Sequence, residues 1–130
     1  MKIIIEHVHQ EPFHSVTRQD VATVLKIIPA DWVGPAHVFL ISGQKLESTV
    51  HDRPVLLNGV TFRIMSRGQN KSAVIKALLL ELAAQATRTF PRKFHRFDKV
   101  QLRKLEETIA PYYLRLLAAM GPVATPSRRG

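Results

Sequence analysis

The stretch that decides the fold reads Pro54-Val-Leu-Leu-Asn-Gly-Val-Thr-Phe-Arg-Ile-Met65. Its two halves are rich in the β-branched and aromatic residues that β-strands prefer. Between them, Asn58-Gly59 favours the positive backbone dihedrals of a tight type I′ turn. The stretch therefore predicts a β-hairpin over residues 54–65.

Two more strands and a helix are expected before this hairpin. Residues 3–8 begin with three consecutive isoleucines, and residues 36–41 read Ala-His-Val-Phe-Leu-Ile, so both runs are typical of strands. Between them, Thr17 stands three residues before Asp20 in the pattern of a capping box, and apolar residues follow at helical spacing. We therefore expect a helix over residues 17–28.

Two helices are expected after the hairpin. Residues 70–89 are apolar around nearly the whole helical circumference, which is typical of a buried helix. Asp98 and Gln101 form a second capping-box pattern and open an amphipathic helix, which Pro111 should kink or divide. Residues 121–130 contain no apolar pattern, so we expect a flexible basic tail there.

The order of these elements predicts a single α+β domain over residues 1–120. In it, a small, mostly antiparallel sheet with a hairpin packs against about three helices. The length of 130 residues and the apolar content of 45% suit one core. The chain has no Cys, which excludes disulfides, thiolate zinc sites and Cys nucleophiles. Because no apolar run approaches the roughly 20 residues of a membrane span, we expect a cytoplasmic protein without a membrane partner.

The second half of the chain carries all of the net charge of +9. Residues 1–66 contain six Lys/Arg and six Asp/Glu, whereas residues 67–130 contain thirteen and four. Within the second half, residues 88–104 combine a dense series of cations with three interleaved phenylalanines. Cations attract phosphates through counterion release, and aromatic faces stack on unpaired bases. The predicted polyanion-binding residues are Arg88, Arg92, Lys93, Arg96, Lys99, Arg103 and Lys104.

The three phenylalanines, Phe90, Phe94 and Phe97, have a second interpretation. They could anchor the linker in the core, in which case the cations would form an ordinary solvated surface. A possible auxiliary anion contact precedes the buried helix, where free backbone amides and the helix dipole favour an anion. Its residues are Arg67, Asn70 and Lys71.

The buried helix contains the frame Leu80-Glu81-Leu82-Ala83-Ala84. This frame resembles the helix of small zincin metallopeptidases, where His-Glu-x-x-His places two imidazoles on one zinc and the Glu acts as general base. The order of elements over residues 16–117 is also similar to that of single-domain zincins. Leu80 and Ala84 replace both histidines, so the resemblance implies a degenerate scaffold without a cofactor, a metal or catalytic residues. A buried Glu81 should then pair with a Lys or Arg from the hairpin or the last helix, or lie at the helix edge.

These observations favour a noncatalytic adaptor that binds nucleic acid, nonspecifically or as single strands, or an acidic protein. Two alternatives stay open. A metal-dependent hydrolase could use unconventional ligands from His7, His9, His14 and Glu106 or Glu107. A small structural subunit of a larger assembly could present an apolar contact patch made of Trp32, Phe39, Tyr112 and Tyr113.

Overall fold

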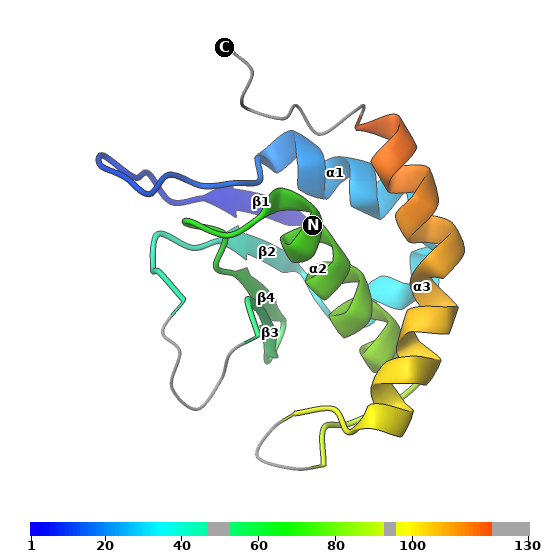
Figure 1. Ribbon diagram of the computed structural model, residues 1–130. Helices are drawn as coiled ribbons and strands as arrows, with labels where there is room; N and C mark the ends of the chain where they lie inside the picture. Colours follow the sequence, from blue (N-terminus) through cyan, green and yellow to red (C-terminus); the bar gives the residue numbers. More distant parts are fainter. Residues whose placement is uncertain (47–52, 93–95, 121–130) are drawn as a thin grey trace.

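The computed structural model describes residues 1–46, 53–92 and 96–120 (Figure 1). It shows an α+β fold built on a mixed sheet. The elements in chain order are β1 (Lys2–Ile5), α1 (Arg18–Ile27), the 3₁₀-helix η1 (Ala30–Val33), β2 (Val38–Ile41), β3 (Val55–Asn58), β4 (Thr61–Ile64), α2 (Lys71–Ala86) and α3 (Lys99–Ala119). The tail expected at residues 121–130 lies outside the described residues.

The sheet has the strand order β1-β2-β4-β3. The pairs β1–β2 and β2–β4 are parallel, and only the hairpin pair β3–β4 is antiparallel among the described strands. The prediction of a mostly antiparallel sheet is therefore wrong. Its physical reason is the connection through α1, because a helical crossover returns the chain in its original direction and brings β2 parallel to β1.

The predicted hairpin is confirmed, with a different turn. Asn58 pairs with Thr61, so Gly59 and Val60 form the two-residue loop. Within that loop only Gly59 has a positive φ, of 64°. A positive φ at the first loop residue alone is the requirement of a type II′ turn, not of the predicted type I′ turn.

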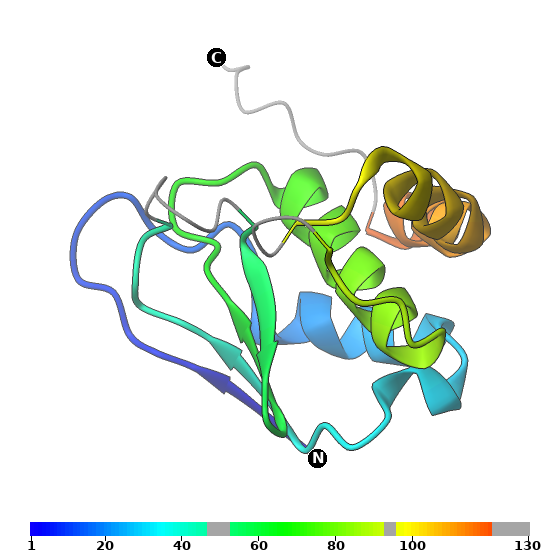
Figure 2. The ribbon, with the colours of Figure 1, turned by 90° about the horizontal axis from the view of Figure 1, so that it is seen from below.

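The helices lie on one side of the sheet (Figure 2). α2 contacts β3 on one side and α3 on the other, and α1 contacts β1. The nearly uniform apolar surface of α2 follows from this central position, because the helix packs against neighbours on several sides. α3 forms the outer layer, and its more polar face is exposed.

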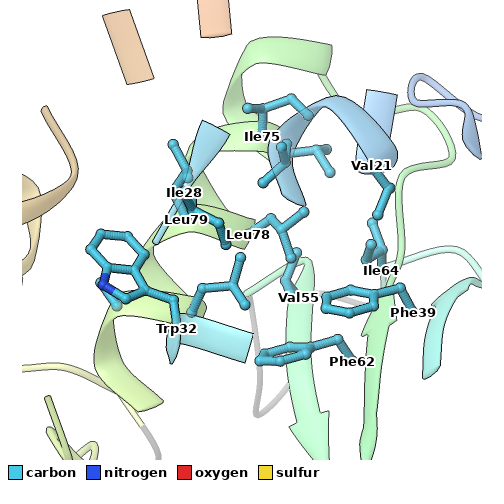
Figure 3. Packing of buried hydrophobic residues seen from close by; sticks show 14 of the residues in the cluster. Val21, Ile28, Trp32, Phe39, Val55, Phe62, Ile64, Ile75, Leu78 and Leu79 are labelled. Carbon is cyan, nitrogen blue, oxygen red and sulfur yellow. The ribbon is translucent and has the colours of Figure 1, made fainter. Parts of the chain in front are cut away.

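One hydrophobic cluster joins the sheet to α1, α2 and α3. Figure 3 shows the part of this cluster between the sheet, α1 and α2. The rings of Phe39 and Phe62 stack with their centroids 5.2 Å apart, beneath Leu78 and Leu79 of α2. Trp32 is only 8% exposed, and its ring meets that of Tyr112 edge-on at 5.0 Å. The expected apolar contact patch is therefore wrong, because Trp32 and Phe39 are part of the core and the two tyrosines pack against it.

Both predicted capping boxes are confirmed, at Thr17 with Asp20 and at Asp98 with Gln101. The sequence predicts that Pro111 kinks or divides α3. The helix runs unbroken through Pro111, so the prediction of a division is wrong, while the kink stays a prediction. Proline removes one backbone hydrogen bond, and the buried apolar residues on both sides of it hold α3 against the core. None of the described helices combines the length and the apolar character that crossing a bilayer requires.

Candidate functional site

The linker after α2 begins with a well-formed helix end. The Arg88 N–H donates to the Gln85 carbonyl at 3.2 Å, and the Thr89 N–H donates to the Ala84 carbonyl at 2.8 Å. Arg88 has a positive φ of 54°. These features are those of a Schellman motif, which turns the chain sharply away from the helix axis. The motif directs the exposed Arg88 and Phe90 away from the core.

Gln101 ties this linker to the first turn of α3. Its side-chain Nε2 donates to the Phe90 carbonyl at 2.6 Å, and its Oε1 accepts from the Asp98 N–H at 3.0 Å. Gln101 is 7% exposed, so both hydrogen bonds are shielded from water. The linker and the start of α3 are therefore held together as one surface.

Two adjoining hollows mark this surface. The larger has a volume of about 450 Å³ and the smaller about 370 Å³, and both are lined by Val100 and Lys104. Phe90, which is 68% exposed, lines the larger hollow. We call this surface the basic hollow, and its described cations are Arg88, Arg92, Lys99, Arg103 and Lys104.

Few carboxylates oppose these cations. Arg92 Nη1 lies 3.5 Å from Asp98 Oδ2, and Arg103 Nε lies 3.5 Å from Glu107 Oε2. The two arginine side chains are 75% and 83% exposed, and such pairs contribute little binding energy in water. In the part of the chain that the structure describes, the other cations of the hollow form no ion pair. The hollow is therefore strongly positive.

Two predicted polyanion-binding residues, Lys93 and Arg96, are not among the described residues that line the basic hollow. Lys93 and Phe94 lie outside the described residues. Arg96 lines a different pocket together with Phe97, whose ring packs against the core. The ring of Phe97 therefore anchors the linker in the core, whereas Phe90 is exposed beside the cations.

The three residues of the predicted auxiliary anion contact all make contacts within the fold. The Arg67 guanidinium donates to the carbonyls of Gln10, Pro12 and Gly43. The Asn70 side chain caps α2, and Lys71 Nζ lies 3.1 Å from Asp20 Oδ1. The sequence pattern marked a helix start correctly, but it did not reveal that these polar groups already have partners within the fold.

Glu81 occupies a second notable site. Its Oε2 lies 3.0 Å from Arg53 Nη1, which confirms the predicted ion pair with a cation at the hairpin. Burial raises the pKa of Glu81 to about 7, although the Arg53 charge acts to lower it. Within the described residues, neither Nε nor Nη1 of Arg53 makes a well-aligned hydrogen bond. The two charges are therefore close but poorly aligned, so burial outweighs their attraction.

A pocket of about 320 Å³ opens beside this pair. The Arg53 guanidinium lies over the Phe97 ring, with Cζ 5.1 Å from the ring centroid, in the geometry of a cation–π contact. The sequence indicated Glu81 but not Arg53, because nothing in the residues before the hairpin distinguishes that arginine from a surface cation. The pocket is lined by Arg53, Pro54, Ala77, Leu80, Glu81, Arg96, Phe97 and Leu102.

The ligands of the alternative metal site are not brought together. Both ring nitrogens of His14 lie within hydrogen-bonding distance of protein oxygens, the Ser66 hydroxyl at 3.2 Å and the Glu6 carbonyl at 2.7 Å. Glu106 pairs with Lys76 at 3.0 Å. In the described ranges, no three His, Asp or Glu side chains gather in a metal-binding arrangement.

Comparison with family models, with curated proteins and with solved structures finds no match for this chain.

Proposed function

We propose that this chain is a noncatalytic binding module that holds single-stranded nucleic acid in the basic hollow. The observation that supports this function most strongly is the convergence of the described cations on two adjoining hollows that also present Phe90. Cations that line one surface offer contacts to phosphates, and an exposed ring offers a stacking surface for an unpaired base.

The combination of cations with exposed apolar side chains in the larger hollow favours nucleic acid over an acidic protein as the ligand. Acidic side chains need only the cations, whereas bases also need an accessible aromatic face and apolar surface beneath them. Phe90 and Val100 are 68% and 65% exposed, and both line the larger hollow. Two exposed apolar side chains among cations have no evident role in solubility, but they suit a base that lies flat.

The proposed scaffold is similar to that of zincins that have lost their metal. The order of the elements and the central position of α2, which carries Glu81, support this proposal. Leu80 and Ala84 cannot coordinate zinc, and a glutamate without a metal-bound water has no nucleophile to activate. The scaffold would therefore position a binding surface and perform no hydrolysis.

Charge reversal in the basic hollow tests the function. The variant carries Arg92→Glu, Lys99→Glu and Lys104→Glu, all at exposed positions. Glutamate at the start of α3 complements the helix dipole, so the fold should be retained. We expect the affinity for a fluorescent single-stranded oligonucleotide, measured by anisotropy, to fall by at least about tenfold, because three phosphate contacts are lost.

The matched control reverses three exposed cations outside the hollow, with Lys2→Glu, Lys26→Glu and Lys45→Glu. Both variants change the net charge equally, so a general electrostatic attraction would weaken binding equally in both. The proposal predicts a much smaller loss in the control. An equal loss in the two variants, or unchanged binding in the hollow variant, would show that the basic hollow is not the binding site.

A further inference from the structure

The pocket beside Glu81 has the composition of a ligand site for an amphipathic anion. Its walls are apolar and come from three parts of the chain, the start of the hairpin, α2 and the start of α3. Its volume of about 320 Å³ is within the range of small-molecule sites. The side chains that form its apolar walls are those of Pro54, Ala77, Leu80, Phe97 and Leu102.

Among the described residues, the charged groups that line this pocket are two arginines and one carboxylate. Arg53 and Arg96 lie on the linker segments before β3 and α3, and Glu81 lies on α2. The Arg53 guanidinium is mostly buried, with 21% of the side chain exposed, and its contact with Glu81 is poorly aligned. A planar guanidinium binds best to two anionic oxygens in its own plane. The Arg53 Nε and Nη1 groups therefore remain able to donate hydrogen bonds to an anion that is better aligned than the Glu81 carboxylate.

We propose that this pocket binds a small organic anion with an apolar body, and that its carboxylate or phosphate group replaces the Glu81 carboxylate at Arg53. The apolar body would lie along Leu80 and Leu102, and the positive charge of the two arginines would hold the head group. This site is separate from the basic hollow and does not depend on the function proposed for it.

Ligand binding at Arg53 is linked to a proton on Glu81. Among the described residues, the charged side chains that line the pocket with Glu81 are Arg53, which pairs with it, and Arg96. When a ligand anion takes over Arg53, the Glu81 carboxylate loses the attraction that lowers its pKa, so the pKa rises from about 7 and the group takes up a proton. Because the complex binds more protons than the free protein, the affinity should increase as the pH falls from 8 to 6.

Titration with octanoate tests this site. Octanoate combines a carboxylate with a flexible apolar chain, and calorimetry should show saturable binding with proton uptake at pH 7. Octan-1-ol, which has a similar chain without charge, should bind at least about tenfold more weakly, because it cannot pair with Arg53. Octyl phosphate supplies the second head group, and tighter binding of either anion identifies the preferred one. No saturable binding of either anion, or equal binding of octan-1-ol, would overturn the proposal.

Two substitutions locate the site. Arg53→Met should reduce octanoate affinity by at least about tenfold, because it removes the guanidinium. Ala77→Phe keeps every charge and fills the pocket, so it should prevent binding even if Arg53→Met folds poorly. Glu81→Gln should retain binding but lose its dependence on pH between 6 and 8. Unchanged octanoate affinity in Ala77→Phe would contradict the proposed location.

The variant with the reversed basic hollow separates the two proposals. Arg92→Glu, Lys99→Glu and Lys104→Glu lie outside this pocket, so octanoate affinity should remain within about twofold of the original value. Loss of oligonucleotide binding with retained octanoate binding supports two separate sites. Loss of octanoate binding in a folded hollow variant would contradict the assignment to Arg53.

Discussion

Glu81 illustrates how the surroundings of one residue decide its chemistry. On the sequence it stands in an apolar run, so a paired and buried carboxylate was the natural expectation. The structure provides the partner, Arg53, at 3.0 Å. Burial nevertheless raises the pKa of Glu81 to about 7, so the carboxyl group is about half protonated at neutral pH. The charge of this pair therefore depends on pH near neutrality.

The raised pKa of Glu81 predicts a pH-dependent stability. The unfolded chain should bind this proton with the ordinary pKa of 4.5, whereas the folded chain holds it up to about 7. The folded state therefore binds more protons between these values. The contribution of Glu81 to stability is full below about pH 4.5 and is lost as the pH rises to about 7, with a magnitude on the order of 3 kcal/mol.

Glu81→Gln removes this dependence because glutamine does not titrate. The unfolding free energy of the original chain minus that of this variant should decrease as the pH rises from 4.5 to 7, because only the original chain loses the contribution of the bound proton. Urea denaturation followed by circular dichroism at a series of pH values measures it. A difference that stays constant, or that increases with pH, would mean that burial does not control the protonation of Glu81.

Single residues of the basic hollow were partly predictable from the sequence. The density of cations between residues 88 and 104 identified the region. The separation of Phe90 from Phe97 could not be predicted, because the linker has no periodic pattern that assigns one ring to the core. The contacts of Arg67 with Pro12 and of Lys71 with Asp20 could not be predicted either, since these partners are distant in the sequence.

At the level of elements, local patterns predicted the helices and strands better than their pairing. Capping boxes are local signals, so the starts of α1 and α3 were identified correctly. The direction of strand pairing depends instead on how the connections cross the sheet. The helix α1 between β1 and β2 makes that pair parallel, and the hairpin places β4 next to β2. Neither arrangement leaves a signal within the strands themselves.

Gln101 couples α3 to the linker through two side-chain hydrogen bonds. Gln101→Met should remove the hydrogen bonds to the Phe90 carbonyl and the Asp98 N–H while preserving side-chain volume. We expect the free energy of unfolding to fall by about 1–3 kcal/mol, because buried polar groups are left unpaired. Oligonucleotide affinity should also fall severalfold, because Phe90 loses its position beside α3.

Thr17→Ala is the matched control for Gln101→Met. This substitution removes one half of the capping box of α1, which should lower the free energy of unfolding by about 1 kcal/mol. Thr17 is not among the residues that line the basic hollow. Chemical denaturation measures stability for both variants, and anisotropy measures oligonucleotide affinity. Weaker binding after Thr17→Ala, or unchanged binding after Gln101→Met, would mean that Gln101 contributes only to stability.

At the scale of the whole molecule, the fold turns an uneven charge along the sequence into a local surface. The first 66 residues are electrically balanced, and the excess of cations follows the hairpin. Some of these cations pair with carboxylates of the same chain, Lys71 with Asp20 and Lys76 with Glu106. The cations around the start of α3 remain opposed by few carboxylates and line the hollows. The net charge of the sequence could not distinguish the cations that pair with carboxylates from those that line the hollows.

The most direct test of the basic hollow is to map the bound oligonucleotide by nuclear magnetic resonance. A chain of 130 residues is small enough for backbone amide spectra of the ¹⁵N-labelled protein, titrated with a short single-stranded oligonucleotide at low salt. We expect the largest chemical-shift changes within residues 88–92 and 98–104. Changes that are largest on the sheet or on α1, or that spread evenly over the molecule, would contradict it.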